Sequence, residues 1–309
     1  MKKFLVSVLL FSSVLIVLAV AFECMQRRIP NTYRFTRGLI ENRGGNISTA
    51  VIGSSVVNCG LDPALMPSGS YNLAISGEWL CFNRKLLERY AADMPHLRTV
   101  VLGIAYQTLW SDDDPKADVR SVVSHKIYMD IRRDGDWWPG SEVLSAGQLF
   151  LRKWSKWYLR HKPTLHNDSL GLDHGYDLSE RKREWKEEIP DMLAGQSEQY
   201  AADRDKALYR RNVAHLEAIA AFCRECGIAL LVVVPPVHRL YAARAGAEQL
   251  GDLRAALRRL AQGYANVRVF DYFADDRFGD DDFYNGNHLS ADCGAQKFTR
   301  IFCRDAGLE

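Results

Sequence analysis

Serine, glycine and histidine residues stand at three places where chemistry on an acyl group could be assembled. Gly53-Ser54-Ser55 and Ser76-Gly77 each follow a short apolar run, and His288 ends the sequence Asn285-Gly286-Asn287-His288. A serine hydroxyl is a weak nucleophile until an imidazole within hydrogen-bond reach accepts its proton. A nearby glycine lets a backbone N–H approach a developing oxyanion without a side chain in the way. These residues, in this order, favour acyl transfer through a serine nucleophile.

Five apolar runs of strand length are expected to position these residues. They alternate with segments of helical periodicity, which is typical of a parallel sheet covered on both faces. In such sheets the site lies at the carboxyl ends of the strands. The expected strands are residues 50–52, 71–75, 99–102, 228–234 and 267–270, and the expected helices are residues 79–90, 203–226, 250–261 and 291–303.

The motifs resemble those of the SGNH, or GDSL, hydrolase superfamily. The similarity covers most of residues 47–305 apart from an insertion, and it rests on the sequences at 52–55, 72–77 and 287–295. The resemblance implies an α/β fold with a flavodoxin-like, three-layer, doubly wound parallel sheet. It also implies that Ser55 is the nucleophile and His288 the base. Gly77 and the Ser55 backbone would then donate to the oxyanion.

Three positions depart from the family pattern. Ser54 replaces the aspartate before the family serine, and Ala105 stands near the place of an asparagine that donates to the oxyanion. Asn285 replaces the aspartate three residues before the histidine. An asparagine can orient an imidazole but brings no negative charge, and a comparable change in a serine protease costs about 10⁴ in kcat. Asp282, in an acidic run typical of a solvated loop, is the alternative orienting residue.

Further polar residues follow the third and fourth expected strands. Tyr106 and Gln107 are candidate substrate-binding residues that would replace the missing donor. His238 follows Pro235-Pro236-Val237, and it either contacts substrate or is an exposed loop residue. Residues 173–177 are expected to form a flexible loop. No residue set has the spacing of a metal site, so neither a metal nor a cofactor is expected.

A segment at about 112–200 breaks the alternation of strands and helices, and we expect a mainly helical insertion there. It is rich in tryptophan. These rings either cap the site and stack on sugar rings, or pack the insertion onto the sheet. The tryptophans are Trp137, Trp138, Trp154, Trp157 and Trp185.

The N-terminal region is a candidate membrane segment. Residues 4–22 form an uncharged run behind Lys2 and Lys3. As a helix this run would reach roughly 28 Å, close to the roughly 30 Å of a bilayer core. Ala19-Val20-Ala21 also fits a signal-peptide cleavage site, so both an anchor and a cleaved signal remain open. Residues 1–25 are therefore assigned to the anchor or signal, 26–46 to a linker and 47–305 to the α/β domain.

Charge gives a mixed prediction for orientation. Four arginines follow the apolar run, which by charge bias favours a cytoplasmic C-terminal side. The Lys-Lys-apolar start is instead the export pattern, and long domains cross membranes largely regardless of flanking charge. We therefore expect an extracytoplasmic domain tethered to the membrane.

Composition excludes several classes of protein. The chain has 309 residues, of which 47% are hydrophobic and 25% charged, so it can bury a sizeable core and is neither disordered nor a disulfide scaffold. Forty Lys and Arg against 38 Asp and Glu leave no basic excess for nucleic acid. The seven cysteines lack a framework spacing, and Cys223 and Cys226 are expected to pack at a helix end.

The anchor makes the chain similar to membrane-tethered SGNH members that act beside polysaccharide O-acetylation systems, such as those on alginate, or in teichoic acid D-alanylation. The resemblance implies an acyl-ester hydrolase or O-acyltransferase acting on a cell-envelope polysaccharide. Its partners would be a glycan or acyl-ester substrate, the membrane and a membrane O-acyltransferase. A catalytically degenerate domain that binds glycan or scaffolds such an acyltransferase is the alternative, and a purely structural envelope protein is a third.

Overall fold

The structure is a computed structural model that describes residues 1–111, 119–133, 137, 140–203 and 206–308. The chain divides into two compact units. Unit 1 comprises Met1–Phe35 and Asp114–Leu165, and unit 2 comprises Thr36–Asp113 and His166–Glu309.

Unit 2 is built on a parallel five-stranded sheet. Its strands are β1 (Thr49–Gly53), β2 (Ser70–Asn72), β3 (Thr99–Gly103), β4 (Ala229–Val234) and β5 (Val267–Asp271), in the order β2-β1-β3-β4-β5. All four pairings are parallel, as the continuous apolar runs predict. The second strand is shorter than expected. Leu73 and Ile75 still donate backbone hydrogen bonds to β1 beyond its end.

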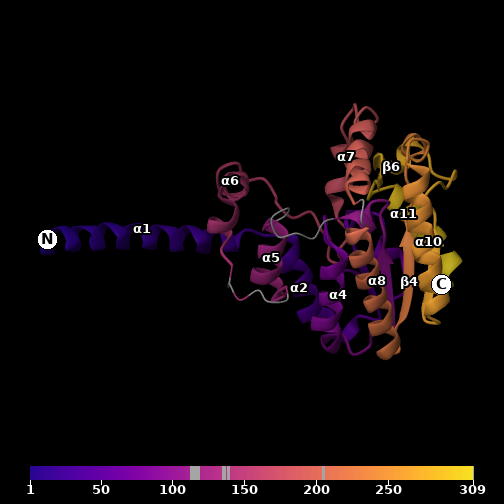
Figure 1. The fold of residues 1–309 in the computed structure, drawn as a ribbon, viewed down its shortest axis with the longest axis horizontal. Coiled ribbons are helices and arrows are strands. Elements are labelled where there is room, and N and C mark those ends of the chain that lie inside the picture. Colours follow the sequence, from indigo (N-terminus) through magenta and orange to yellow (C-terminus); the bar gives the residue numbers. More distant parts are fainter. Residues whose placement is uncertain (112–118, 134–136, 138–139, 204–205, 309) are drawn as a thin grey trace. The chain divides into compact units, whose positions relative to one another are not determined.

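Helices cover the sheet in the manner of a doubly wound fold. The chain moves from β1 to β2 in one direction and then crosses back to β3, and right-handed crossovers therefore place the intervening helices on opposite faces. The helices α4 and α8 lie side by side (Figure 1). The helices of this layer arrangement are α3 (Ser55–Asn58), α4 (Leu80–Tyr90), α8 (Ala207–Glu225), α10 (Ala247–Gly263) and α11 (Gly294–Ala306).

The core of unit 2 lies between the sheet and these helices. Every residue of β1 is buried, and Ile52, Val101 and Val232 are fully excluded from solvent. Further elements of unit 2 are η1 (Gly44–Asn46), η2 (Pro63–Leu65), η3 (Ala91–Asp93), η4 (Thr108–Trp110), η6 (His174–Tyr176), η7 (Leu178–Glu180), α7 (Ile189–Ala202), α9 (Arg239–Ala242), η8 (Asp280–Asp282), β6 (Phe283–Asn285) and β7 (His288–Leu289).

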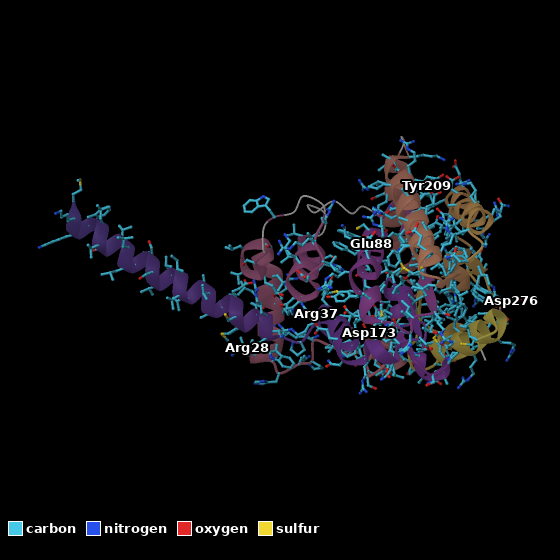
Figure 2. All side chains as sticks on the ribbon, turned by 90° about the horizontal axis from the view of Figure 1, so that it is seen from below. Arg28, Arg37, Glu88, Asp173, Tyr209 and Asp276 are labelled. Atoms are coloured by element: carbon cyan, nitrogen blue, oxygen red, sulfur yellow. The ribbon has the colours of Figure 1, made fainter. Side chains whose placement is uncertain are left out.

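Unit 1 is helical. It contains α1 (Lys2–Arg28), α5 (Val119–Met129), α6 (Glu142–Trp154) and the π-helical turn η5 (Ser155–Leu159), and α6 packs on both α1 and α5. The helix α1 is long and apolar enough to cross a membrane. Its side chains project freely along the apolar stretch (Figure 2). The helix is therefore a candidate membrane anchor or signal sequence.

The segment boundaries differ from those expected. Residues 26–46, which were assigned to a linker, form the end of α1, the helix α2 (Thr32–Arg43) and η1. The insertion is shared between the units, because unit 1 ends at Leu165.

The tryptophans of the insertion have different environments. Trp154 packs on Phe22 and Tyr158 in unit 1, and Trp185 is buried against His238 in unit 2. Trp137 is exposed, and Trp138 lies outside the described residues. These two rings therefore make packing contacts, but the contacts are with α1, Tyr158 and His238 and not with the strands of the sheet.

Candidate active site

The serine candidate follows β1 at a tight turn. Gly53 has φ +134°, a backbone conformation that favours glycine, and a Cβ there would lie 2.8 Å from the carbonyl oxygen of Gly103. The chain then turns at Ser54, and Ser55 begins α3. This strand-turn-helix places the Ser55 side chain at the carboxyl edge of the sheet, where β1 lies between β2 and β3.

The histidine candidate lies on a β-hairpin whose two strands are joined by a two-residue turn, Gly286-Asn287. The strands β6 and β7 pair antiparallel, with Asn285 directly opposite His288. The buried residues Phe283 and Leu289 anchor the two strands. At the turn, the carbonyl of Gly286 accepts a hydrogen bond of 2.9 Å from the backbone N–H of His238. The hairpin thus holds Asn285 and His288 side by side.

The structure brings Ser55, His288 and Asn285 together. His288 Nε2 lies 2.7 Å from Ser55 Oγ, and His288 Nδ1 lies 2.9 Å from Asn285 Oδ1. Asn285 Oδ1 also accepts the backbone N–H groups of Asn287 and His288, at 3.2 and 3.0 Å. An amide nitrogen cannot accept such bonds, so they fix the orientation of the Asn285 amide. Nδ1 must therefore carry the proton, and Nε2 is free to accept the proton of Ser55.

Burial dominates the electrostatics of His288. Desolvation lowers the pKa of its imidazole to about 4, and the residue at Nδ1 is the neutral Asn285, which does not stabilise the charged form as a carboxylate would. Tyr176 contributes to this burial, since its ring lies 5.1 Å from the imidazole centroid at 31°. The imidazole is therefore neutral near pH 7 and can accept a proton, but it is a weaker base than a histidine paired with aspartate.

Two buried asparagines hold the serine helix in place. Asn58 Nδ2 donates to the carbonyl of Ala74 at 2.9 Å, and Asn72 Nδ2 donates to the carbonyl of Val57 at 2.7 Å. Both side chains are almost completely buried, so these bonds are made away from competing water. They fix α3 against the segment that follows β2.

The oxyanion candidate Gly77 follows this same segment. The amide of Ile75 donates to the carbonyl of Gly53 at 3.2 Å, so the loops after β1 and β2 run side by side. Gly77 has φ +78° and is exposed. Within the described residues, neither its N–H nor that of Ser55 has an acceptor. Both amides are therefore available to a ligand.

Ala105, Tyr106 and Gln107 follow β3, where further hydrogen-bond donors were expected. Ala105 and Tyr106 form hydrogen bonds within the protein. The N–H of Ala105 donates to Thr108 Oγ1 at 2.8 Å. Tyr106 is buried, and its hydroxyl accepts the Gly246 N–H at 2.9 Å. Gln107 caps η4, and its Oε1 is buried without a partner in the described part of the chain. Tyr106 is therefore held in a structural contact, and a substrate-binding role for Gln107 stays a prediction.

His238 is neither an exposed loop residue nor a residue open to substrate. It is fully buried, and its Nε2 lies 2.9 Å from Asp280 Oδ1. The Leu240 N–H donates to Nδ1, so Nε2 carries the proton given to Asp280. Lys186 and His238 together lower the pKa of Asp280 to about 2. Asp280 is thus a structural link rather than part of a solvated run.

Asp282 is not the orienting residue. Its carboxylate is nearly buried and accepts hydrogen bonds from Lys297 Nζ at 2.7 Å and from the Gly279 N–H at 2.8 Å. The Nδ1 partner of His288 is Asn285. Asp280, Asp281 and Asp282 form the turn η8 directly before the hairpin, and Asp282 holds this turn through the Gly279 N–H.

A segment that was expected to be a flexible loop packs against the site. Gly171 has φ +105°, and a Cβ there would lie 1.9 Å from the carbonyl oxygen of Asn72. The Asp173 N–H donates to the carbonyl of Asn58 at 3.1 Å. This segment brings Tyr176 over the imidazole, where its hydroxyl hydrogen-bonds Ser76. Tyr176 was missed because nothing in its local spacing marks it.

Comparisons with known proteins give little beyond this geometry. No protein-family model and no curated protein matches the chain. One similar solved structure is described as that of "a putative platelet activating factor from Streptococcus pneumonia", with 13% identity and a TM-score of 0.43 over 97% of this chain and 98% of that chain. A likeness at this level carries no functional argument, so the proposal below depends on the residues of the site.

Proposed function

We propose that this protein is an acyl-ester hydrolase or O-acyltransferase that acts on a cell-envelope polysaccharide through an acyl-serine intermediate. One observation carries the proposal: Ser55 Oγ lies 2.7 Å from His288 Nε2, on an imidazole whose other nitrogen is held as a donor. That arrangement is what a serine needs to lose its proton as it attacks an ester carbonyl.

The reaction follows from these groups. Ser55 Oγ attacks the acyl carbon while its proton passes to His288 Nε2, and the N–H groups of Ser55 and Gly77 receive the negative oxygen. His288 then returns the proton to the departing alcohol, which leaves an acyl ester on Ser55. Water, or a sugar hydroxyl, loses a proton to Nε2 and attacks this ester. His288 returns this proton to Ser55 Oγ as the bond between Oγ and the acyl carbon breaks, which regenerates the serine and completes hydrolysis or transfer.

The polysaccharide part of the proposal rests on the resemblance to exported, membrane-tethered members of the SGNH superfamily. The candidate membrane helix α1 and the exposure of Ser76 and Gly77 are compatible with a large substrate outside the cytoplasm. A membrane O-acyltransferase would be the partner that loads or receives acyl groups.

A second candidate function is favoured by Asn285. This residue supplies no charge to the imidazolium, and the Ala105 position supplies no side-chain donor. Both features fit a domain that binds an acylated glycan, or scaffolds an acyltransferase, without turning over esters.

An assay of ester turnover distinguishes the enzyme from the non-catalytic binding domain. The purified full-length chain is incubated with an acetylated polysaccharide and, separately, with a chromogenic acetyl ester, and the release of acetate or dye is followed. We expect slow release that disappears in Ser55→Ala and His288→Ala. Ser54→Ala is the matched control, because Ser54 makes no side-chain cap bond and should leave the rate unchanged. Retained glycan binding with no turnover in the native chain would favour the binding domain.

A further inference from the structure

The end of α6 and the turn η5 pack directly on the last turns of α1. The ring of Trp154 lies 6.0 Å from that of Phe22, and the Tyr158 hydroxyl donates to the carbonyl of Met25 at 3.0 Å. At the other end of α6, Glu23 accepts the Ser141 hydroxyl at 2.9 Å. These contacts are all within unit 1. They tie the helix and the turn to one level along α1.

That level coincides with the end of the apolar run. Phe22 is its last residue, and Arg27 and Arg28 follow within two turns. A 19-residue helix reaches roughly 28 Å, so a bilayer that holds residues 4–22 ends close to Phe22. Trp154 and Tyr158 then lie where amphipathic aromatic rings are enriched, at the boundary between hydrocarbon and headgroups.

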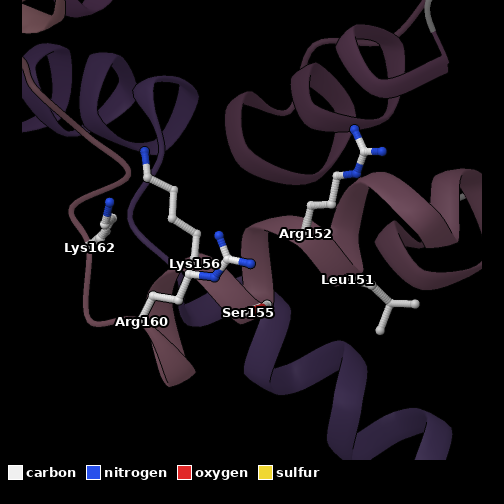
Figure 3. A pocket seen from close by; sticks show the side chains of 6 residues that line it. All are labelled: Leu151, Arg152, Ser155, Lys156, Arg160 and Lys162. Atoms are coloured by element: carbon white, nitrogen blue, oxygen red, sulfur yellow. The ribbon is translucent and has the colours of Figure 1, made fainter. Parts of the chain in front are cut away.

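A basic pocket opens at this level. Its volume is about 640 Å³. Figure 3 shows the side chains that line it. Four of its six lining residues are cationic. The lining residues are Leu151, Arg152, Ser155, Lys156, Arg160 and Lys162.

The four cations have no acidic partner within the described residues. The neighbouring Lys153 does, since its Nζ lies 3.9 Å from Glu142. Like charges gathered around one pocket repel one another, and none of these four side chains forms an ion pair within the described residues to offset the repulsion. The pocket is therefore suited to an anion of more than one charge, or to several anions.

The helix and turn that form the pocket, α6 and η5, also carry exposed leucines, of which Leu151 lines the pocket. Leu144, Leu151 and Leu159 are 77%, 55% and 63% exposed. A helix with bare apolar side chains beside lysines and arginines is typical of an element that lies in the membrane interface, with its apolar groups among the acyl chains. Long basic side chains reach the headgroup level from such a position.

We propose that this pocket binds the phosphate headgroups of anionic phospholipids in the leaflet at the C-terminal end of α1. The cations match the charge of these lipids, and the contacts with Phe22 and Met25 hold the pocket at the required depth. A glycan is the less favoured ligand, because sugar binding does not explain the exposed leucines. Each basic residue near an anionic surface strengthens binding by about fivefold.

Hydrogen–deuterium exchange on the full-length chain tests the proposal. The protein is placed in nanodiscs of phosphatidylcholine alone or of phosphatidylcholine with phosphatidylglycerol, and exchange of the amides of residues 151–162 is compared. We expect exchange to be at least about fivefold slower in the anionic discs, as even one engaged cation would give. High salt should remove the difference, because the screening length falls to about 3 Å at 1 M.

Matched variants locate the effect. Changing Arg152, Lys156, Arg160 and Lys162 to Gln should abolish the protection. A control that changes Arg224, Arg258, Arg300 and Arg304 to Gln removes the same charge from exposed positions of unit 2 and should retain the protection.

Equal exchange of the native chain in both discs would overturn the proposal, whatever the variants do. Protection that appears in phosphatidylcholine discs on adding inorganic phosphate or soluble alginate, and matches that from phosphatidylglycerol, would also overturn it. Those results would make the pocket a site for a free anion or for an acidic glycan. The salt experiment uses only the native chain, so a variant that fails to fold does not decide the outcome.

Discussion

His288 Nδ1 lies 2.9 Å from Asn285 Oδ1, the same oxygen that accepts the backbone N–H groups of Asn287 and His288. The hairpin therefore fixes the tautomer of the imidazole through a neutral amide. Orientation and charge stabilisation, which a carboxylate would supply together, are separated here. Asn285 orients the imidazole but does not stabilise its positive charge.

Replacing Asn285 by Asp should add the missing charge. Its oxygen would keep the three N–H donors, so the carboxylate is accommodated in the same geometry. We expect kcat for ester hydrolysis to rise on the order of tenfold to a thousandfold, below the ~10⁴ that the reverse change costs in a serine protease. Steady-state kinetics on the chromogenic ester measures this change. An Asn285→Asp chain with unchanged or lower kcat, and unchanged thermal stability, would argue against His288 as the base.

The pH dependence follows from the lowered pKa of His288. The base must be neutral to accept a proton, and its pKa is about 4. Activity should therefore be level through neutral pH and fall as the pH drops through about 4. In Asn285→Asp the acidic limb should move upward, because the carboxylate stabilises the imidazolium. Profiles of kcat/KM check both statements, and a native limb near pH 6.5 would show that the imidazole is solvated.

Tyr176 is expected to act on His288 through burial. In Tyr176→Ala the face of the imidazole opens to water, so the pKa of His288 should rise toward 6.5 and the acidic limb should follow it. Tyr176→Phe is the matched control, because it keeps the ring and removes only the hydrogen bond to Ser76. NMR titration of the His288 ring gives a readout independent of turnover. Equal pKa values in all three chains would exclude this role.

Asp282 is expected to matter for stability and not for proton transfer. Asp282→Asn would weaken the interaction with Lys297 and the bond from the Gly279 N–H. We expect the free energy of unfolding to fall by about 1–3 kcal/mol, the usual range for a buried polar group that loses a charged partner. Denaturant unfolding measures the loss. If kcat fell strongly while stability did not change, Asp282 would have a catalytic role after all.

The sheet could be predicted from the sequence because its signals are local. The runs at β1, β3 and β4 are mainly apolar and end at a glycine or a proline, whereas the run at β5 contains Arg268 and ends at Asp271. The observed strands match these runs within about a residue. Ser55 could be placed at the carboxyl edge because it directly follows β1. His288 lies on the separate antiparallel hairpin of β6 and β7, so its pairing with Ser55 was expected from the resemblance to the SGNH superfamily and not from a strand end.

The residues that the sequence misrepresented depend on contacts between distant segments. His238 is buried because it joins the turn at Gly286 to Asp280, and Tyr106 because its hydroxyl is bound by Gly246. Tyr176 reaches the imidazole only because Gly171 lets the chain approach Asn72. Local periodicity and short motifs do not indicate contacts between distant segments. For this reason the sequence could not distinguish a packing role for Tyr106 and His238 from a contact with substrate.

Covalent labelling of Ser55 tests most directly whether this serine is a nucleophile activated by His288. The full-length chain is treated with a serine-reactive phosphonate and digested, and the adduct is located by mass spectrometry. We expect one modified peptide, with the adduct on Ser55. The adduct should be absent from Ser55→Ala, strongly reduced in His288→Ala and retained in Ser54→Ala. An unlabelled native chain, or labelling that persists in Ser55→Ala, would contradict this expectation.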